Sequence, residues 1–173
     1  MAAKRFSGSG VFGGMAGRLA GTAAGRVLRA AALISVALYL VPVGAHVAEL
    51  AAKLALPPDQ YMIVQQIYAG WALFGVFIAA ALLITLVQAA LAWRDGVDRG
   101  LSFAAFLCLA ATQIVFWMFT YPMNVETRNW TVMPAMFDSA RWQWEFSHAA
   151  SAALTAAAFL CLVAGTVRRS GRW

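Results

Sequence analysis

The sequence predicts an all-α integral membrane protein folded as a four-helix bundle, and three observations support this prediction. Of the 173 residues, 62% are hydrophobic and only 12% are charged, whereas soluble domains are nearer half apolar and a quarter charged. The apolar residues gather in four stretches, and each exceeds the roughly 20 residues that a helix needs to cross a bilayer. Ala and Leu dominate these stretches without the alternation typical of strands. Composition and pattern therefore exclude a disordered chain and disfavour a soluble globule.

Each predicted span follows from one of these stretches. We expect membrane helices at residues 27–52, 61–93, 101–121 and 142–167. In the first span, Pro42 removes a backbone hydrogen bond, so a kink is expected there. The second span is read as one continuous helix, with Gly70 and Gly75 allowing neighbouring helices to pack closely.

The segments around the spans complete the predicted organisation. Residues 1–26 are basic and rich in Gly and Ala, and we expect a flexible arm; residues 27–173 form one membrane domain. The first two connections are short. The third connection, residues 122–141, is long, and long loops in compact proteins are often functional.

The distribution of basic residues predicts an orientation. When the spans alternate in direction, ten of the 13 Lys and Arg residues fall on the side that holds both termini. The other side holds Lys53, Arg128 and Arg141. Because basic residues favour the cytoplasmic side, both termini are predicted to be cytoplasmic, in a membrane that is most simply the bacterial inner (plasma) membrane. The net charge of +6 thus reflects topology, and no nucleic-acid partner is expected.

Four ionisable residues inside the spans are candidates for the functional site, because ionisable groups are costly in a bilayer. His46 and Glu49 lie three residues apart near the outer end of the first span, and Glu145 and His148 lie three apart near the outer start of the fourth. Residues at i and i+3 share a helix face. The two spans run in opposite directions, so the two pairs are expected to face each other and to be the catalytic residues.

Three interpretations of these pairs remain open. Glu-x-x-His motifs on facing helices hold metals in di-iron bundles, so His46, Glu49, Glu145 and His148 are candidate ligands for iron or another transition metal. A second interpretation is a buried polar network that joins the first and fourth helices without a metal. A third is a haem held by His46 and His148.

Other polar and aromatic residues cluster at the same outer end. The candidate substrate-binding residues are Gln65, Gln66, Tyr68, Trp117, Asn124, Asn129, Trp130, Arg141 and Trp144. At least one of Gln65 and Gln66 should face the bundle, since neighbouring side chains point in different directions. For Tyr61, Trp142 and Trp144, an interfacial aromatic belt is the simpler explanation. An i,i+4 ion pair is expected between Arg141 and Glu145.

The last third of the chain resembles a known family. The run Asn124-Val-Glu-Thr-Arg-Asn129-Trp130-Thr131, followed by Pro134 and then by Arg141-Trp-Gln-Trp144-Glu145-Phe-Ser-His148, is similar to the anthrone oxygenase-like family of small four-span membrane proteins. The resemblance implies that Asn124, Arg141, Trp144 and His148 are pocket residues. It also implies that the chain is related to proteins of which some oxygenate polycyclic aromatic substrates to quinones without an obvious cofactor, and of which most have no assigned activity.

Two functional hypotheses follow from the sequence. The first is an oxidoreductase or oxygenase whose outer pocket takes a flat lipophilic molecule, such as a quinone or a polyketide. The second is an accessory subunit of a larger membrane complex, or a homo-oligomer, in which the His and Glu residues only lock the bundle. A metal, a haem or a bound organic molecule would separate the two.

Overall fold

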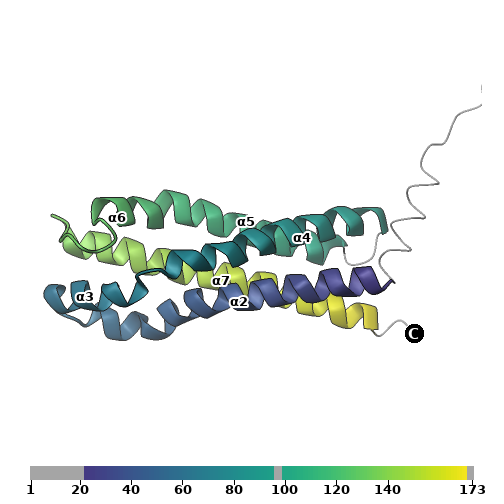
Figure 1. Ribbon diagram of the computed structural model, residues 1–173, viewed down its shortest axis with the longest axis horizontal. Coiled ribbons are helices and arrows are strands. Elements are labelled where there is room, and N and C mark those ends of the chain that lie inside the picture. Colours follow the sequence, from purple (N-terminus) through teal and green to yellow (C-terminus); the bar gives the residue numbers. More distant parts are fainter. Residues whose placement is uncertain (1–21, 96–98, 171–173) are drawn as a thin grey trace, which may run out of the picture.

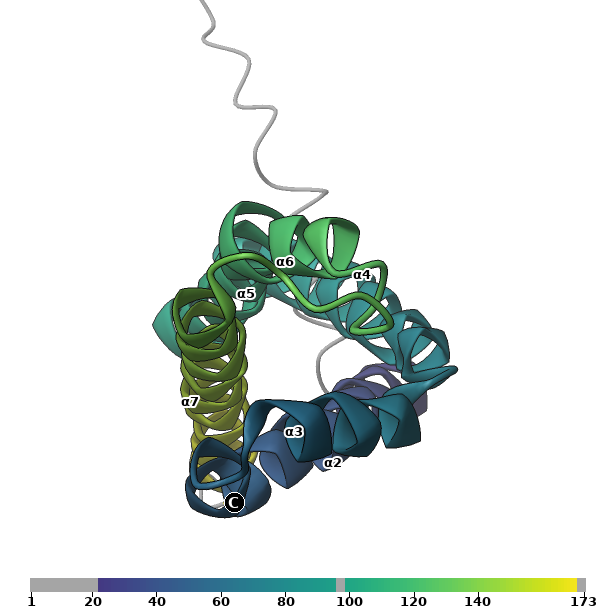
Figure 2. The same ribbon diagram turned by 90° about the vertical axis from the view of Figure 1, so that its left-hand side faces the viewer.

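The computed structural model describes residues 22–95 and 99–170, and this part of the chain is helical, without strands. The two longest helices are α2 (Ala23–Leu54) and α7 (Phe137–Ser170), and between them lie α4 (Gly75–Asp95) and α5 (Arg99–Val115). Each of these four packs against two others, so that α2, α4, α5 and α7 close a ring around a central axis (Figures 1 and 2). The predicted four-helix bundle is confirmed.

Four helical segments are long and apolar enough to cross a membrane: Ala23–Leu54, Trp71–Ala92, Arg99–Glu126 and Phe137–Arg168. Large apolar side chains such as Ile34, Leu83 and Leu160 lie exposed on their outer faces. Apolar surface of this kind is compatible with a lipid bilayer environment. Both ends of the described chain lie at the same end of the bundle (Figure 1). The predicted arm, residues 1–26, lies mostly outside the described residues, and α2 begins before residue 27.

Small side chains let the helices approach at the end of the bundle that carries the chain termini. Ala32, Ala81, Ala105 and Ala158 are fully buried there, one from each long helix, with Leu109 among them. Close packing of small residues is a common way to join helices in lipid. The interior of this part of the bundle is mainly apolar, although Thr85 and Gln88 are buried in it, whereas the buried ionisable residues His46, Lys53 and Glu145 lie at the opposite end.

The predicted second span is wrong in its first part. Residues 61–74 do not continue α4; they form α3 (Pro58–Gln65) and two short 3₁₀ helices, η1 (Gln66–Tyr68) and η2 (Trp71–Phe74). Gly70, between the 3₁₀ helices, has φ of 85°, a conformation that side chains other than Gly disfavour. The prediction that Gly70 serves close helix packing is wrong, because a Cβ there would meet nothing within 4 Å. Its backbone conformation is what breaks the helix.

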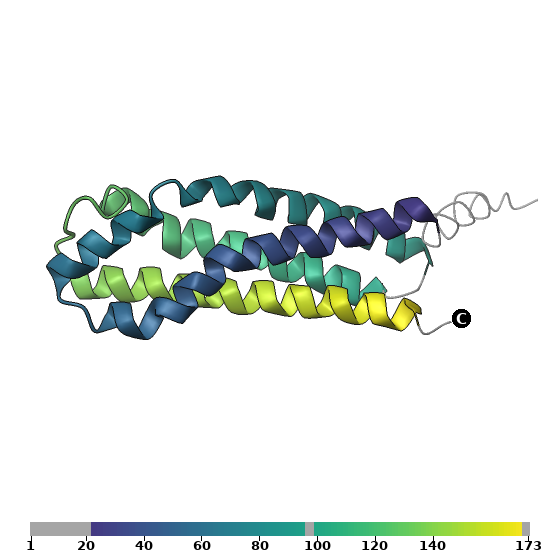
Figure 3. The same cartoon turned by 60° about the horizontal axis from the view of Figure 1, so that its bottom comes forward.

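The third connection is also shorter than predicted. After α5 the chain continues through a π-helical segment, η3 (Phe116–Thr120), and α6 (Tyr121–Glu126), so the link to α7 covers only residues 127–136. Pro122, the predicted start of this connection, stands in the first turn of α6, a position where Pro is well tolerated. The link packs beside α3 at the end of the bundle opposite the chain termini (Figure 3). We call this the α3 end.

Candidate functional site

A buried ion pair joins α2 to α7 at the α3 end. Lys53 Nζ lies 2.9 Å from Glu145 Oε1, and the two side chains are 3% and 0% exposed. The Lys53 ammonium also lies over the rings of Tyr68 and Trp144, at 4.8 and 5.0 Å from their centroids. Charges removed from water need such partners. Lys53, predicted only as one of the basic residues of the outer side, is thus a buried partner of Glu145.

Glu145 is held by two further side chains from α3. Tyr61 donates its hydroxyl to Glu145 Oε1 over 2.8 Å, and Gln65 donates its amide over 3.4 Å to the same oxygen. Burial, and then the negative charge of Glu145, raise the pKa of the Tyr61 phenol, so Tyr61 stays protonated and keeps donating. Tyr61 is fully buried, and its assignment to an interfacial belt was wrong.

The two histidines meet, as the spacing predicted. The rings of His46 on α2 and His148 on α7 lie with their centroids 4.1 Å apart. His148 Nδ1 lies 2.9 Å from the carbonyl oxygen of Trp144; because a carbonyl only accepts, Nδ1 carries the proton and Nε2 keeps a lone pair. His46 Nδ1 lies 3.5 Å from the Lys53 ammonium, which only donates, so its proton sits on Nε2. The neutral pair thus presents one donor and one acceptor.

Glu49 takes part in a separate contact. Tyr68 donates its hydroxyl to Glu49 Oε2, and burial, followed by this hydrogen bond, raises the pKa of the Tyr68 phenol. The Tyr68 ring in turn lies 4.4 Å from the ring of His46, centroid to centroid. Glu49 therefore reaches the histidine pair through Tyr68 and sets the orientation of that ring.

Aromatic rings enclose the histidine pair. Trp144 lies 4.1 Å from His148 and 5.0 Å from His46, centroid to centroid, and its indole N–H donates to Asn124 Oδ1 over 2.8 Å. Trp130 lies 5.7 Å from Trp144, and Trp71 lies 5.7 Å from His46. Flat, polarisable aromatic rings therefore surround the imidazoles of His46 and His148.

A cavity of about 730 Å³ lies beside these rings. Its volume is in the range of ligand pockets. Towards the chain termini its lining is mostly apolar, with Val43, Ile78 and Leu82, and Tyr39, Gln113 and Ser151 add polar groups there. At the α3 end the lining is polar and aromatic; it includes His46, Gln65, Gln66, Tyr68, Asn124, Asn129, Trp130, Trp144 and His148. The π-helical segment η3 adds Phe116 and Thr120 to the wall, and such segments are frequent at functional sites.

The link between α6 and α7 lines the cavity in an unusual backbone conformation. Arg128, Asn129 and Trp130 have φ of 48°, 57° and 61°, a region that costs energy for residues other than Gly. The surrounding contacts fix it: Gln66 Nε2 donates to the Trp130 carbonyl over 2.7 Å, and the Trp130 N–H donates to Thr127 Oγ1 over 2.9 Å. The strain holds the Trp130 ring, 2% exposed, in the cavity wall.

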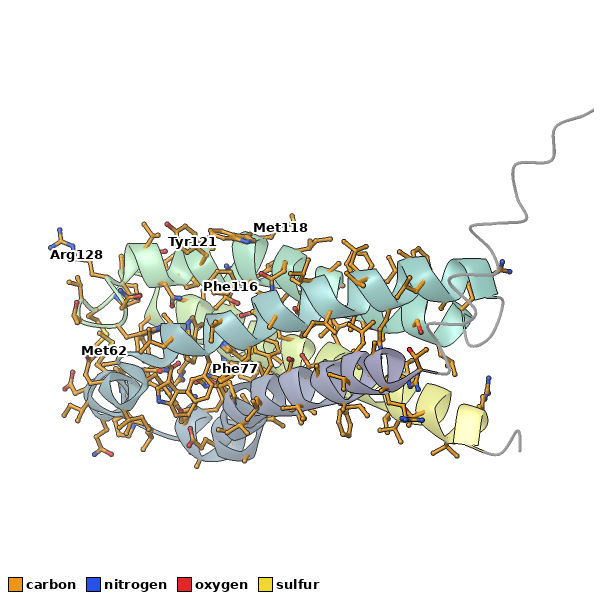
Figure 4. The ribbon with its side chains drawn as sticks, turned by 45° about the vertical axis from the view of Figure 1, so that its right-hand side comes forward. Met62, Phe77, Phe116, Met118, Tyr121 and Arg128 are labelled. Atoms are coloured by element: carbon orange, nitrogen blue, oxygen red, sulfur yellow. The ribbon has the colours of Figure 1, made fainter. Side chains whose placement is uncertain are left out.

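Nine of the 13 predicted site residues line the cavity, and Glu49, Glu145, Trp117 and Arg141 do not. Trp117 is 58% exposed on the outside of the bundle. Neighbouring Met118 and Tyr121 project outward there as well (Figure 4). Gln65 faces the bundle, as expected, at 3% exposure. Trp144 is a cavity residue and not part of a belt, whereas Trp142 is half exposed.

Arg141 does not form the predicted pair with Glu145. Its guanidinium lies 2.9 Å from Asp138 Oδ1 and donates to the Leu56 carbonyl over 3.0 Å. This second bond ties α7 to the turn after α2. The i,i+4 spacing allows a pair between Arg141 and Glu145, but Lys53 on the neighbouring helix forms the ion pair with the Glu145 carboxylate instead.

The geometry bears on the metal and haem interpretations. Within residues 22–95 and 99–170, no three His, Cys, Asp or Glu side chains are grouped so that they could hold a metal ion. Glu145 is bound to Lys53, Tyr61 and Gln65, and Glu49 is bound to Tyr68. Of the four predicted metal ligands, only the imidazoles of His46 and His148 therefore lie next to each other. Axial haem ligands stand on opposite faces of the macrocycle, whereas His46 and His148 are in direct contact. Neither cofactor fits this arrangement of side chains.

Lys53 and Trp71 are two of the site residues that were not predicted from the sequence. Lys53 lies seven residues after His46, two helical turns along the same face, and that spacing was the available signal. Trp71 reaches the site only because the chain breaks at Gly70, and no periodicity indicated this break.

Comparison of the chain with protein families, with curated proteins and with solved structures gave no match. The interpretation of the site therefore depends on its own geometry.

Proposed function

We propose that the protein is an integral membrane oxidoreductase that binds a flat lipophilic aromatic or quinone-type molecule in the cavity. The observation that carries this proposal is the position of two touching histidines in the wall of a 730 Å³ cavity. Both line it among aromatic rings, and the apolar part of the lining lies deeper in the bundle. A molecule dissolved in the bilayer is the natural occupant of such a site.

The chemistry that the histidines offer is proton transfer. The lone pair on His148 Nε2 accepts a proton from a hydroxyl or an activated C–H group of the bound molecule, as a general base. The proton on His46 Nε2 is available to an oxygen that gains charge. Lys53, 3.5 Å from His46 Nδ1, keeps that tautomer in place. Oxidation of an electron-rich aromatic molecule by dioxygen begins more easily once such a proton has been removed.

Orientation and location form part of the proposal. With both termini cytoplasmic, the α3 end faces the outer side of a bacterial plasma membrane and the cavity lies in the outer leaflet. Arg26, Arg29, Arg99 and Arg168 belong to the end that carries the termini, which supports this orientation.

A cavity-filling variant tests the proposal. Ala79 lines the cavity and Ala90, on the same helix, does not. Ala79→Trp should abolish binding of an alkyl-substituted hydroquinone or benzoquinone to the protein in detergent, measured by isothermal titration calorimetry. Ala90→Trp is the matched control and should bind as the unmodified protein does. Equal binding by both variants, or binding by none of the three proteins, would contradict the proposal.

Activity is tested separately. Oxygen consumption with a polycyclic hydroxyaromatic probe should be lost in His148→Ala while binding of the probe is retained. If oxygen consumption were the same with and without the His148 imidazole, the proposed proton transfer would be wrong.

A second candidate is a non-catalytic accessory subunit. The observation that favours it is the full engagement of Lys53 and Glu145 with each other, since this pair needs no ligand to explain it. A homo-oligomer or a larger membrane complex would then be the functional unit. Gentle detergent extraction should recover stoichiometric partner proteins if this is correct, and an isolated protein that binds the probes favours the oxidoreductase.

A further inference from the structure

Two buried polar atoms in the cavity wall have no hydrogen-bond partner within the described part of the chain. They are the amide oxygen Oε1 of Gln65 and the indole nitrogen Nε1 of Trp130. The two residues are 3% and 2% exposed and both line the cavity. A buried polar atom without a partner costs free energy, so these atoms indicate which groups an occupant must supply.

The hydrogen-bonding roles of both atoms are fixed by chemistry. Gln65 places its other amide atom, Nε2, 3.4 Å from Glu145 Oε1. An ionised carboxylate only accepts, so the Gln65 nitrogen must face it and the oxygen is the atom left free. An indole N–H only donates. The cavity wall therefore presents one unsatisfied acceptor and one unsatisfied donor.

The acceptor and the donor belong to the same end of the cavity. Gln66, next to Gln65, donates its amide to the Trp130 carbonyl over 2.7 Å. The Tyr61 ring lies 5.1 Å from that of Trp130, centroid to centroid, while the Tyr61 hydroxyl shares Glu145 Oε1 with Gln65. The far lining is mostly apolar, with Val43, Ile78 and Leu82, although Tyr39, Gln113 and Ser151 also line it. An occupant thus needs a polar head at the α3 end and an apolar body beyond it.

We propose that the cavity selects the reduced, hydroxyl-bearing form of its aromatic ligand over the quinone form, with Gln65 as the residue that discriminates them. This inference rests on the proposed function and names the substrate class of that site. A hydroxyl donates to Gln65 Oε1 and accepts from Trp130 Nε1. A quinone carbonyl only accepts, so it satisfies Trp130 and leaves two acceptors, its own oxygen and Gln65 Oε1, facing each other.

The size of the preference follows from the cost of that mismatch. A site built to hydrogen-bond a hydroxyl rejects analogues that lack it, because its buried polar group stays unpaired. We expect the hydroquinone to bind at least about tenfold more tightly than the quinone with the same alkyl chain. The aromatic rings of Trp130 and Trp144 contact both forms equally, so they contribute affinity without discrimination.

Three ligands of matched size test the inference on the unmodified protein. They are an alkylhydroquinone, its dimethyl ether, which has no O–H donor, and the corresponding alkylbenzoquinone. Calorimetric titration is done in detergent without oxygen, to prevent oxidation of the hydroquinone. The dimethyl ether and the quinone should both bind at least about tenfold more weakly than the hydroquinone.

Two variants assign the effect to its residue. Gln65→Met keeps the length of the side chain and removes the acceptor, and it should reduce the preference to about twofold or less. Trp130→Phe removes the donor that both forms use, so it should weaken both forms and keep the preference. Equal binding of hydroquinone, ether and quinone would overturn this inference and leave the proposed function standing. Failure of all three to bind would overturn both.

Discussion

Lys53 Nζ lies 2.9 Å from Glu145 Oε1, and this ion pair is shielded from solvent on every side. It stands next to the histidine pair and fixes two features of the site at once. Lys53 determines which nitrogen of His46 carries the proton, and Glu145 determines which amide atom of Gln65 stays free. The polar chemistry of the cavity wall therefore depends on a pair that does not itself line the cavity.

Removal of Lys53 should destabilise the protein strongly. Lys53→Met leaves Glu145 buried without its cation, which typically costs about 3–5 kcal/mol. The double variant Lys53→Met/Glu145→Gln should regain most of the loss, because no charge remains buried. Thermal unfolding in detergent, followed by circular dichroism, measures both.

The exposed pair of Arg141 with Asp138 is the control for this comparison. The Asp138 side chain is 78% exposed, so Asp138→Asn should change the stability by less than about 1 kcal/mol. If Lys53→Met cost no more than Asp138→Asn, the buried pair would not have the structural importance that we assign to it.

The left-handed backbone at Asn129 should make this position sensitive to the shape of its side chain. Asn129→Val places a β-branched residue at φ of 57° and should destabilise the protein by about 1–3 kcal/mol. Asn129→Gly adopts that conformation without steric cost, so its stability should equal or exceed that of the unmodified protein. The same unfolding temperature for both variants would show that the segment does not keep this conformation.

The Tyr61 phenol should resist ionisation at alkaline pH. Its pKa is raised by burial and then by the charge of Glu145, while an ordinary tyrosine ionises near about pH 10. Because the raised pKa belongs to the folded state, the stabilisation is present below about pH 10 and is lost as the pH rises above it, where the unfolded chain ionises first.

Ultraviolet absorption by phenolate measures the ionisation of Tyr61 directly. Between about pH 9 and 11 the unmodified protein and Tyr61→Phe should show the same phenolate signal while folded, because Tyr61 contributes none of it. A signal smaller in Tyr61→Phe by one tyrosine would mean that the Tyr61 hydroxyl is accessible and ordinary.

The bond between Trp144 and Asn124 should be measurable as a coupling. Trp144 Nε1 donates to Asn124 Oδ1 over 2.8 Å, and Asn124→Ala leaves the indole N–H without that acceptor, at a cost of about 1–2 kcal/mol. In Trp144→Phe the additional change Asn124→Ala should cost much less, since the donor is already gone. Strictly additive effects in this double-mutant cycle would exclude the bond.

The bundle and the meeting of the two histidines were predictable from sequence because both depend on local periodicity. Four apolar stretches of sufficient length indicate four spans, and i,i+3 spacing on helices of opposite direction brings His46 to His148. Nine of the predicted residues line the cavity. Seven of them come from neighbouring ends of helical segments, and Asn129 and Trp130 come from the link between α6 and α7.

The errors arose where a single backbone angle or a tertiary partner decided the outcome. The break at Gly70 requires φ of 85°, and composition does not distinguish that glycine from a packing glycine. The choice of Glu145 between Arg141, four residues away, and Lys53, on another helix, depended on the relative position of α2 and α7. Tyr61 looked interfacial because it begins an apolar stretch, but α3 folds it back over Glu145.

The most direct test of the central claim is an experimental structure of the protein in lipid nanodiscs with an alkylhydroquinone at saturating concentration. We predict density for a planar ring in the cavity, with an oxygen within hydrogen-bond distance of Gln65 Oε1 and Trp130 Nε1, beside the rings of His46 and His148. Density for lipid acyl chains alone in that cavity, or a cavity left empty at saturation, would contradict the account.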